Sequence, residues 1–164
     1  MSGAQFFYVL PYFFSLALSA GIMVYAWKHR RVQGASAYAW LVLMQTLMIL
    51  GFILELLAPG MGGKLFWDKF QWIATCLSTI ALAYFAIQYT EHKIRYPLAL
   101  WGFVTSLPIL MIIAVLTAPL HHFVYPNPLL DQKFIFPELN YSFTWLVHLL
   151  SIHGYVVVLF AVIL

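Results

Sequence analysis

Five apolar stretches, each about as long as a membrane-crossing helix, dominate this sequence of 164 residues. A helix needs about 20 apolar residues to cross the hydrocarbon layer of a bilayer. The hydrophobic fraction is 64% and only 8% of residues are charged, whereas soluble domains carry about 25% charged residues. We therefore predict an all-α, multi-pass transmembrane helical bundle. Its expected helices cover residues 5–27, 38–58, 66–90, 98–117 and 141–164.

Proline and glycine mark the expected connections between these helices. The run from Pro59 to Gly63 predicts a turn after the second helix, because proline and glycine break helices. Pro97 is suited to a helix start, where its missing N–H costs nothing. Residues 118–140 form the only long loop expected. The last apolar run continues to Leu164, so we expect the sequence to be a fragment of a longer protein.

The basic residues predict the orientation in the membrane. The first and third connections carry five of them and the second and fourth carry three: Lys28, Arg30, Arg31, Lys93 and Arg95 against Lys64, Lys69 and Lys133. Cytoplasmic loops are enriched in lysine and arginine, so we expect a multi-pass protein of the cell (inner) membrane with an extracytoplasmic N-terminus. The net charge of +3 is scattered over loops and does not indicate nucleic-acid binding.

Six polar and aromatic side chains are expected at one depth, near the extracytoplasmic surface. Glu55 lies about one turn from the outer end of the second helix, and His148 about 10 Å below the start of the fifth. Ionisable groups at membrane depth are costly and often functional. We therefore predict a ligand pocket that opens outward. Its candidate residues are Glu55, Trp72, His121, His122, Trp145 and His148.

A structural interpretation of the same residues stays open. Tryptophans at this depth commonly form an interfacial belt, and His121 and His122 can be solvated loop residues. Polar side chains deeper in the spans are expected to hydrogen-bond between helices. These are Gln45, Gln88, Thr105 and Ser151.

The sequence predicts no metal, cofactor or catalytic residue in this segment. Adjacent histidines such as His121 and His122 rarely chelate one ion, and no H-x-x-x-H or H-E-x-x-H pattern occurs. Haem would need histidines on facing helices, but His148 and His153 share one helix. Retinal would need a lysine deep in a span, but the only lysine inside an expected span is Lys69, at the very start of the third. No G-x-S-x-G motif, Cys–His arrangement or glycine-rich phosphate loop is present.

Several short motifs occur in a recognisable order over nearly the whole chain. They are Leu54-Glu55, Lys64 to Trp67, Gln88-Tyr89-Thr90, Leu107-Pro108, Leu116 to Phe123 and Trp145 to His148. In these motifs the sequence resembles the N-terminal seven-helix sensory region of bacterial sensor histidine kinases, which also occurs on diguanylate cyclases. The chain departs from the family pattern at Cys76 to Thr79, where a proline is common, and at Ala118, where asparagine is common.

The resemblance implies a sensory input domain of which residues 1–164 would form the first five helices. It implies an extracytoplasmic N-terminus, and a seventh helix leading to a cytoplasmic output domain beyond residue 164. The full-length protein would then be a sensor histidine kinase or a diguanylate cyclase, acting as a homodimer through its output domains. Its signal would be an unidentified small molecule or a membrane-borne stimulus. The alternatives are a small transporter or channel subunit and a structural membrane subunit.

Overall fold

The computed structural model describes residues 3–91, 94–131 and 135–164. Lys93 and Lys133, which contributed to the predicted orientation, lie outside these described residues.

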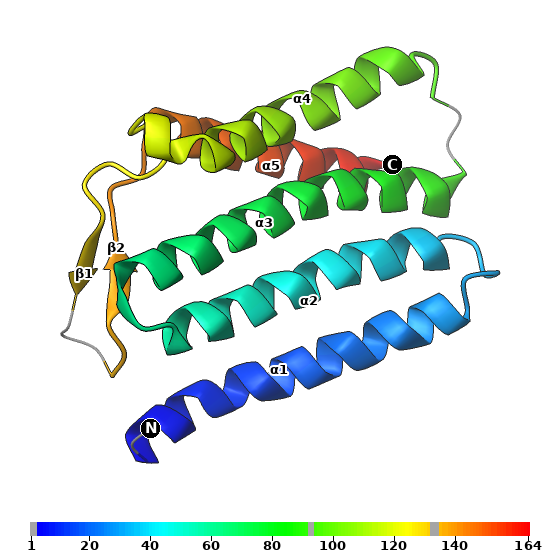
Figure 1. Cartoon of the computed structure of the whole chain (residues 1–164). Helices are drawn as coiled ribbons and strands as arrows, with labels where there is room; N and C mark the ends of the chain where they lie inside the picture. Colours follow the sequence, from blue (N-terminus) through cyan, green and yellow to red (C-terminus); the bar gives the residue numbers. More distant parts are fainter. Residues whose placement is uncertain (1–2, 92–93, 132–134) are drawn as a thin grey trace.

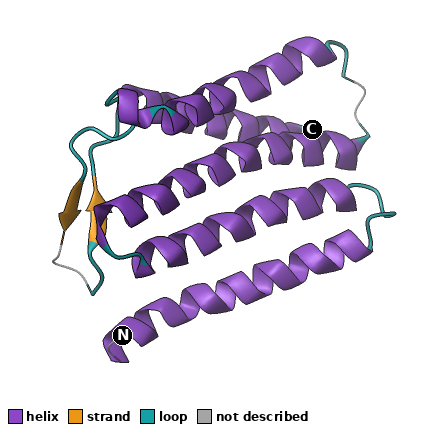
Figure 2. Ribbon diagram, in the orientation of Figure 1, coloured by secondary structure: helices purple, strands orange, loops and turns teal. Residues whose placement is uncertain are grey.

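Five long helices account for most of the described chain (Figures 1 and 2). All five are long and apolar enough to cross a membrane, which confirms the predicted all-α, multi-pass class. In chain order the elements are α1 (Gly3–Lys28), α2 (Ala35–Leu57), α3 (Gly60–Thr90), α4 (Pro97–Leu116), the short 3-10 helix η1 (Ala118–Leu120), β1 (Leu129–Asp131), β2 (Glu138–Asn140) and α5 (Trp145–Ile163).

The helices α1, α2 and α3 lie side by side, and both α4 and α5 pack against α3 (Figure 1). The strands β1 and β2 form an antiparallel hairpin at the end of the bundle where α2 ends and α3 begins. We call this the hairpin end. The opposite end carries Lys28, Arg30, Arg31 and Arg95, and we call it the basic end.

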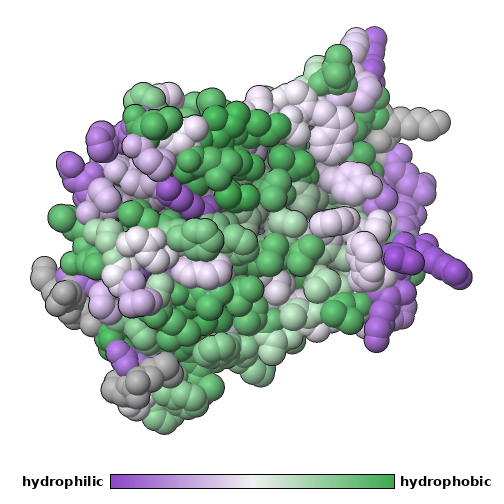
Figure 3. All heavy atoms as spheres, viewed as in Figure 1, coloured by the Kyte–Doolittle hydropathy of each residue, from purple (hydrophilic) through white to green (hydrophobic). Residues whose placement is uncertain are grey.

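The surface of the bundle matches a membrane-embedded protein. Apolar residues cover its middle, whereas hydrophilic residues gather toward the two ends (Figure 3). Large apolar side chains such as Phe14, Leu18 and Val162 point outward, because the surroundings of a spanning helix are lipid chains. At about 1.5 Å per residue, α3 is about 46 Å long and exceeds the hydrocarbon thickness of about 30 Å. Its first turns can therefore reach the polar interface.

Two helix starts differ from the sequence-based expectation by four residues or more. The helix α3 begins at Gly60 and not near Phe66, because Gly60 adopts a φ of 70° and completes the turn immediately after Pro59. The helix α5 begins at Trp145 and not at Tyr141, because the preceding residues continue from β2 in non-helical conformation. The hairpin itself was not predicted from the sequence.

Polar side chains within the spans bond in two ways. The Ser36 hydroxyl of α2 donates to Gln88 Oε1 of α3 at 3.2 Å, which confirms the expected interhelical bond for Gln88. The same expectation is wrong for Thr105 and Ser151. Their hydroxyls donate to the carbonyls of Trp101 and Val147, four residues earlier in the same helix. A short hydroxyl reaches this carbonyl without needing a partner helix.

Candidate functional site

A cavity of about 480 Å³ lies at the hairpin end, where α1, α2 and α3 meet β2 and the segment after it. Three of its lining side chains are carboxylates, and four others are aromatic. We call it the acidic cavity. Its lining residues are Tyr8, Phe52, Glu55, Leu56, Asp68, Gln71, Glu138, Leu139, Asn140, Tyr141 and Phe143.

The first carboxylate, Glu55, links the end of α2 to α3. Gln71 Nε2 donates to Glu55 Oε2 at 2.6 Å. The buried Lys64, which is only 1% exposed, lies close by. Its ammonium donates to the backbone carbonyls of Glu55 at 2.7 Å and Leu56 at 3.4 Å. Lys64 therefore supplies hydrogen bonds to carbonyls at the end of α2, which have no N–H donor within their own helix. It does not pair directly with the Glu55 carboxylate.

The second carboxylate, Asp68, is the final acceptor of a hydrogen-bond chain between α3 and the segment before α5. The Tyr141 hydroxyl donates to the Asp68 carboxylate, at 3.2 Å from Oδ1 and 3.0 Å from Oδ2. The same hydroxyl oxygen accepts the Trp72 indole N–H at 3.1 Å. A hydroxyl that donates and accepts at once holds all three side chains in fixed orientations.

A second tyrosine, Tyr125, lies behind this chain in the hydrophobic core. Its ring packs edge-on against Tyr141, with ring centroids 5.0 Å apart, and its side chain is 6% exposed. The buried Tyr125 hydroxyl neighbours Asp68 but makes no well-aligned hydrogen bond. Burial raises the pKa of both Tyr125 and Tyr141, and the negative charge of Asp68 raises each further. Both phenols therefore stay protonated at neutral pH.

The hairpin brings the third carboxylate, Glu138, to the cavity. In the β1–β2 register Leu130 pairs with Leu139 and Asp131 pairs with Glu138. Phe136, just before β2, is buried with Val9 of α1 and Ile53 of α2. This apolar anchor fixes the hairpin over the ends of α1 and α2, so that Glu138 lines the cavity although it is far from Glu55 in sequence.

Two of the six predicted site residues meet at this cavity. Glu55 lines it directly, and Trp72 supports it through Tyr141. His121 instead lies beyond η1, where its ring stacks on Phe123 and its Nε2 lies 3.0 Å from the Thr117 hydroxyl. His122 is exposed.

The remaining two predicted residues lie on the outer face of α5. Trp145 is the first residue of the helix and is 67% exposed. His148 is also exposed, and its Nδ1 lies 2.8 Å from the Thr144 carbonyl of its own helix start. Neither side chain is among those that line the acidic cavity.

Sequence reasoning missed Asp68, Gln71, Glu138 and Tyr141. The sequence contains a pattern that could have identified part of this set. Asp68, Gln71 and Trp72 are spaced at i, i+3 and i+4, which places them on one face of a helix. No comparable pattern marks Glu138, because its position depends on the hairpin. Within the described ranges, no group of three or more His, Cys, Asp or Glu side chains is arranged to hold a metal ion.

These features define an integral membrane protein that presents a polar cavity at one end of a helical bundle. A family model for the N-terminal 7TM region of histidine kinase matches residues 11–164. The chain belongs to this family of membrane regions from signalling proteins. Comparison with curated proteins and with solved structures gives no significant match.

Proposed function

We propose that this chain is a sensory input domain that detects an extracytoplasmic or membrane-borne signal in the acidic cavity. It relays the signal to a cytoplasmic output domain of the histidine kinase type beyond residue 164. The family supports the general role, and the observation that carries the binding site is the cavity of about 480 Å³ lined by Glu55, Asp68 and Glu138.

The proposed orientation puts the hairpin end outside the cell and the basic end in the cytoplasm. Lys28, Arg30, Arg31 and Arg95 support it, because positive residues favour the cytoplasmic side. At the hairpin end, Lys64 is buried and donates to the carbonyls at the end of α2. It therefore adds little exposed positive charge to the hairpin end, so the basic end is the more positive of the two.

The lining of the cavity favours a signal that carries positive charge. Three carboxylates create a negative potential that attracts cations, and Tyr8, Tyr141 and Phe143 supply aromatic faces that can contact an organic cation. Gln71 and Asn140 add neutral hydrogen-bonding groups. A neutral apolar molecule of the same size would leave these polar groups without partners.

The position of the cavity suggests how binding reaches the rest of the bundle. The Gln71–Glu55 bond joins α3 to α2, and the Tyr141–Asp68 bond joins α3 to the segment that leads into α5. A ligand that binds one arrangement of these elements more tightly shifts the equilibrium toward it. The signal would thus change the packing of α2 and α5 on α3, and the change would pass to the output domains of a homodimer.

The experiment replaces cavity carboxylates in the full-length protein reconstituted in liposomes. Glu55→Gln and Asp68→Asn keep the shape of each side chain and remove its charge. Binding of a panel of organic amines is compared with binding of neutral molecules of matched size, and output activity is recorded with each. We expect amine binding to weaken at least tenfold in both variants, with the output response lost in parallel.

The matched control is Glu91→Gln, which removes a carboxylate at the basic end, just after α3. It is expected to leave both binding and output unchanged. Amine binding and output that survive in both cavity variants would overturn the proposed site. A response to neutral molecules alone would overturn the proposed charge of the signal and leave the sensory role standing.

A further inference from the structure

Two grooves of similar volume flank α3 within the spanning part of the bundle. One, of about 420 Å³, lies between α2 and α5 with α3 as its floor. The other, of about 440 Å³, lies where α2, α3 and α4 meet. We call them the polar groove and the apolar groove. The polar groove is lined by Leu41, Gln45, Ser78, Thr79, Leu82, Ser151, Gly154, Tyr155 and Val158. The apolar groove is lined by Trp40, Met44, Leu77, Ile80, Ala81, Tyr84 and Trp101.

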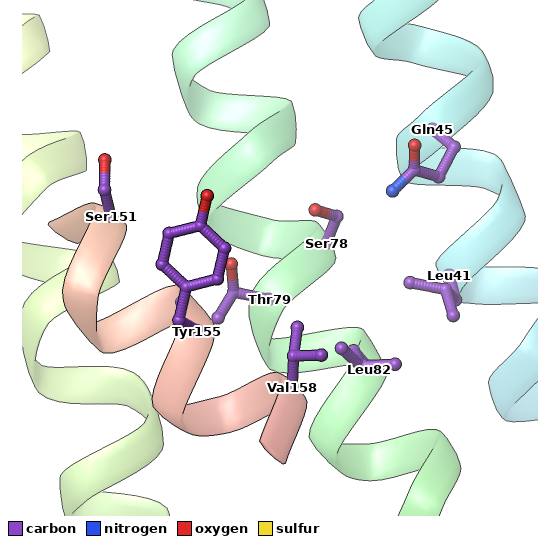
Figure 4. A pocket seen from close by; sticks show the side chains of 9 residues that line it. Leu41, Gln45, Ser78, Thr79, Leu82, Ser151, Tyr155 and Val158 are labelled. Atoms are coloured by element: carbon purple, nitrogen blue, oxygen red, sulfur yellow. The ribbon is translucent and has the colours of Figure 1, made fainter. Parts of the chain in front are cut away.

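The polar groove lies at the middle depth of the membrane. Gln45 is about 15 Å from the start of α2, and Tyr155 is about 15 Å from the start of α5. Figure 4 shows that Gln45 and Ser78 extend toward the space between their helices, with Ser151 and Tyr155 on α5 beside it. Its polar groups therefore lie far from the interfacial water at either end.

Two of these polar groups have no partner among the described residues. Ser78, Thr79 and Ser151 donate to carbonyls of their own helices. Within the part of the chain that the structure describes, the Gln45 amide and the Tyr155 hydroxyl make no hydrogen bond, although Tyr155 is 72% exposed. Placing an unbonded polar group among lipid chains at this depth is energetically unfavourable, so such groups usually hydrogen-bond to a neighbouring helix.

The apolar groove provides the contrast. Its polar atoms belong to Trp40, Tyr84 and Trp101, which lie within about 9 Å of the helix ends at the basic end. They can reach interfacial water there, so lipid chains can fill the rest of the groove. Both grooves have residues of α2 and α3 in their walls, and they differ mainly in the polarity of their lining side chains. The unpartnered polar groups of the polar groove therefore favour contact with a protein segment, whereas the lining of the apolar groove does not.

We propose that the polar groove is the seat of a further transmembrane helix of the same protein, one that follows α5. The family region is described by seven transmembrane helices, and the described residues supply five. The helix α5 runs from the hairpin end to the basic end (Figure 1). A helix that returns after a short connection packs antiparallel beside it. The contacts with α3 and α4 leave two faces of α5 uncovered: the face that lines the polar groove and an outer face that carries Ile152, Val156 and Leu159. The outer face is apolar and can meet lipid chains, so the polar groove is the position that needs the returning helix.

Photo-crosslinking in the full-length protein tests this occupant. Tyr155→p-benzoylphenylalanine places the probe in the polar groove, and Tyr84→p-benzoylphenylalanine places it in the apolar groove as the matched control. After irradiation in the native membrane, we expect the Tyr155 probe to join a peptide of the same chain beyond residue 164. The Tyr84 probe is expected to form adducts with phospholipid. Lipid adducts from both probes, or a crosslinked dimer from the Tyr155 probe, would overturn the proposal.

Two adjacent residues on α2 give a second measurement. Gln45 lines the polar groove and Met44 lines the apolar groove. If a helix satisfies the Gln45 amide, Gln45→Leu should lower the Tm of the full-length protein in nanodiscs by a few degrees, while Met44→Leu leaves it unchanged. A higher Tm for Gln45→Leu would mean that the amide faces lipid, and the proposal would fail. This result does not depend on what binds in the acidic cavity.

Discussion

The side-chain amide of Gln71 donates a 2.6 Å hydrogen bond to the Glu55 carboxylate, and this bond crosses the interface between α3 and α2. It forms at a place where the two helices approach unusually closely. A Cβ at Gly51 would lie 2.8 Å from Gln71 Cγ and 2.9 Å from Phe70 Cδ1. The absence of a side chain at Gly51 therefore creates the room that Gln71 needs to reach Glu55.

The first prediction concerns this close approach. Gly51→Ala should destabilise the protein by about 1–3 kcal/mol, because overpacking forces Gln71 and Phe70 to move. The gain in helix propensity from glycine to alanine, about 1 kcal/mol, offsets only part of this cost. Thermal unfolding in detergent measures the change. Gly21→Ala in α1 is the control, since its Cβ would meet nothing within 4 Å; an equal loss in both variants would contradict the argument.

The second prediction concerns the buried ammonium of Lys64. Lys64→Met should cost about 1–3 kcal/mol of stability, because the carbonyls at the end of α2 lose a donor. Lys69→Met, five residues further along α3, should change stability by less than about 0.5 kcal/mol. Denaturant unfolding of both variants provides the comparison. A Lys64→Met protein as stable as the parent would show that water reaches these carbonyls.

The sequence was sufficient to predict the helices, but it was not sufficient to predict which side chains line the acidic cavity. Each span is a local property of about 20 apolar residues, so all five could be predicted. Glu55 could also be found, because a carboxylate inside an apolar run stands out. Asp68 was harder to recognise, because it lies between Lys64 and Lys69 and resembles part of a charged connection, although its spacing to Gln71 places both on one helix face.

His148 shows that a predicted depth in the membrane is not enough to assign a residue to a pocket. His148 was grouped with Glu55 because the two residues share a depth, but depth does not determine which way a side chain faces. In the structure His148 lies on the exposed face of α5 and bonds to Thr144 of its own helix start. Glu138 reaches the cavity only because Phe136 anchors the hairpin against α1 and α2, a contact between distant segments that no local pattern encodes.

The third prediction uses the raised pKa of Tyr125. Burial raises this pKa in the folded protein, so the phenol stays protonated there while the unfolded chain ionises above about pH 10. Stability from this group is present below pH 10 and falls by about 1.4 kcal/mol per pH unit above it. Tyr125→Phe should therefore match the parent at pH 7, where no well-aligned hydrogen bond is lost, and be the more stable protein at pH 11.

Thermal unfolding in detergent at both pH values checks this prediction. Tyr96→Phe serves as control, since Tyr96 is 65% exposed and its replacement leaves the buried Tyr125 phenol in place. An alkaline loss of stability that is identical in the parent and in Tyr125→Phe would mean that other groups cause it.

The last prediction concerns the link between the acidic cavity and α5. Tyr141→Phe removes the hydroxyl that donates to Asp68 and accepts from Trp72. Hydrogen bonds to charged groups contribute about 1.5–3 kcal/mol, so stability should fall by that order. Combining Tyr141→Phe with Asp68→Asn should cost less than the sum of the two single changes, because Asp68→Asn already replaces the charge-assisted bond with a weaker neutral one. If the proposed amine signal is relayed through this bond, Tyr141→Phe protein should still bind the amine but show a reduced output response. Additive losses in the double variant would show that the two side chains act separately, and a full output response would show that the signal travels through other contacts.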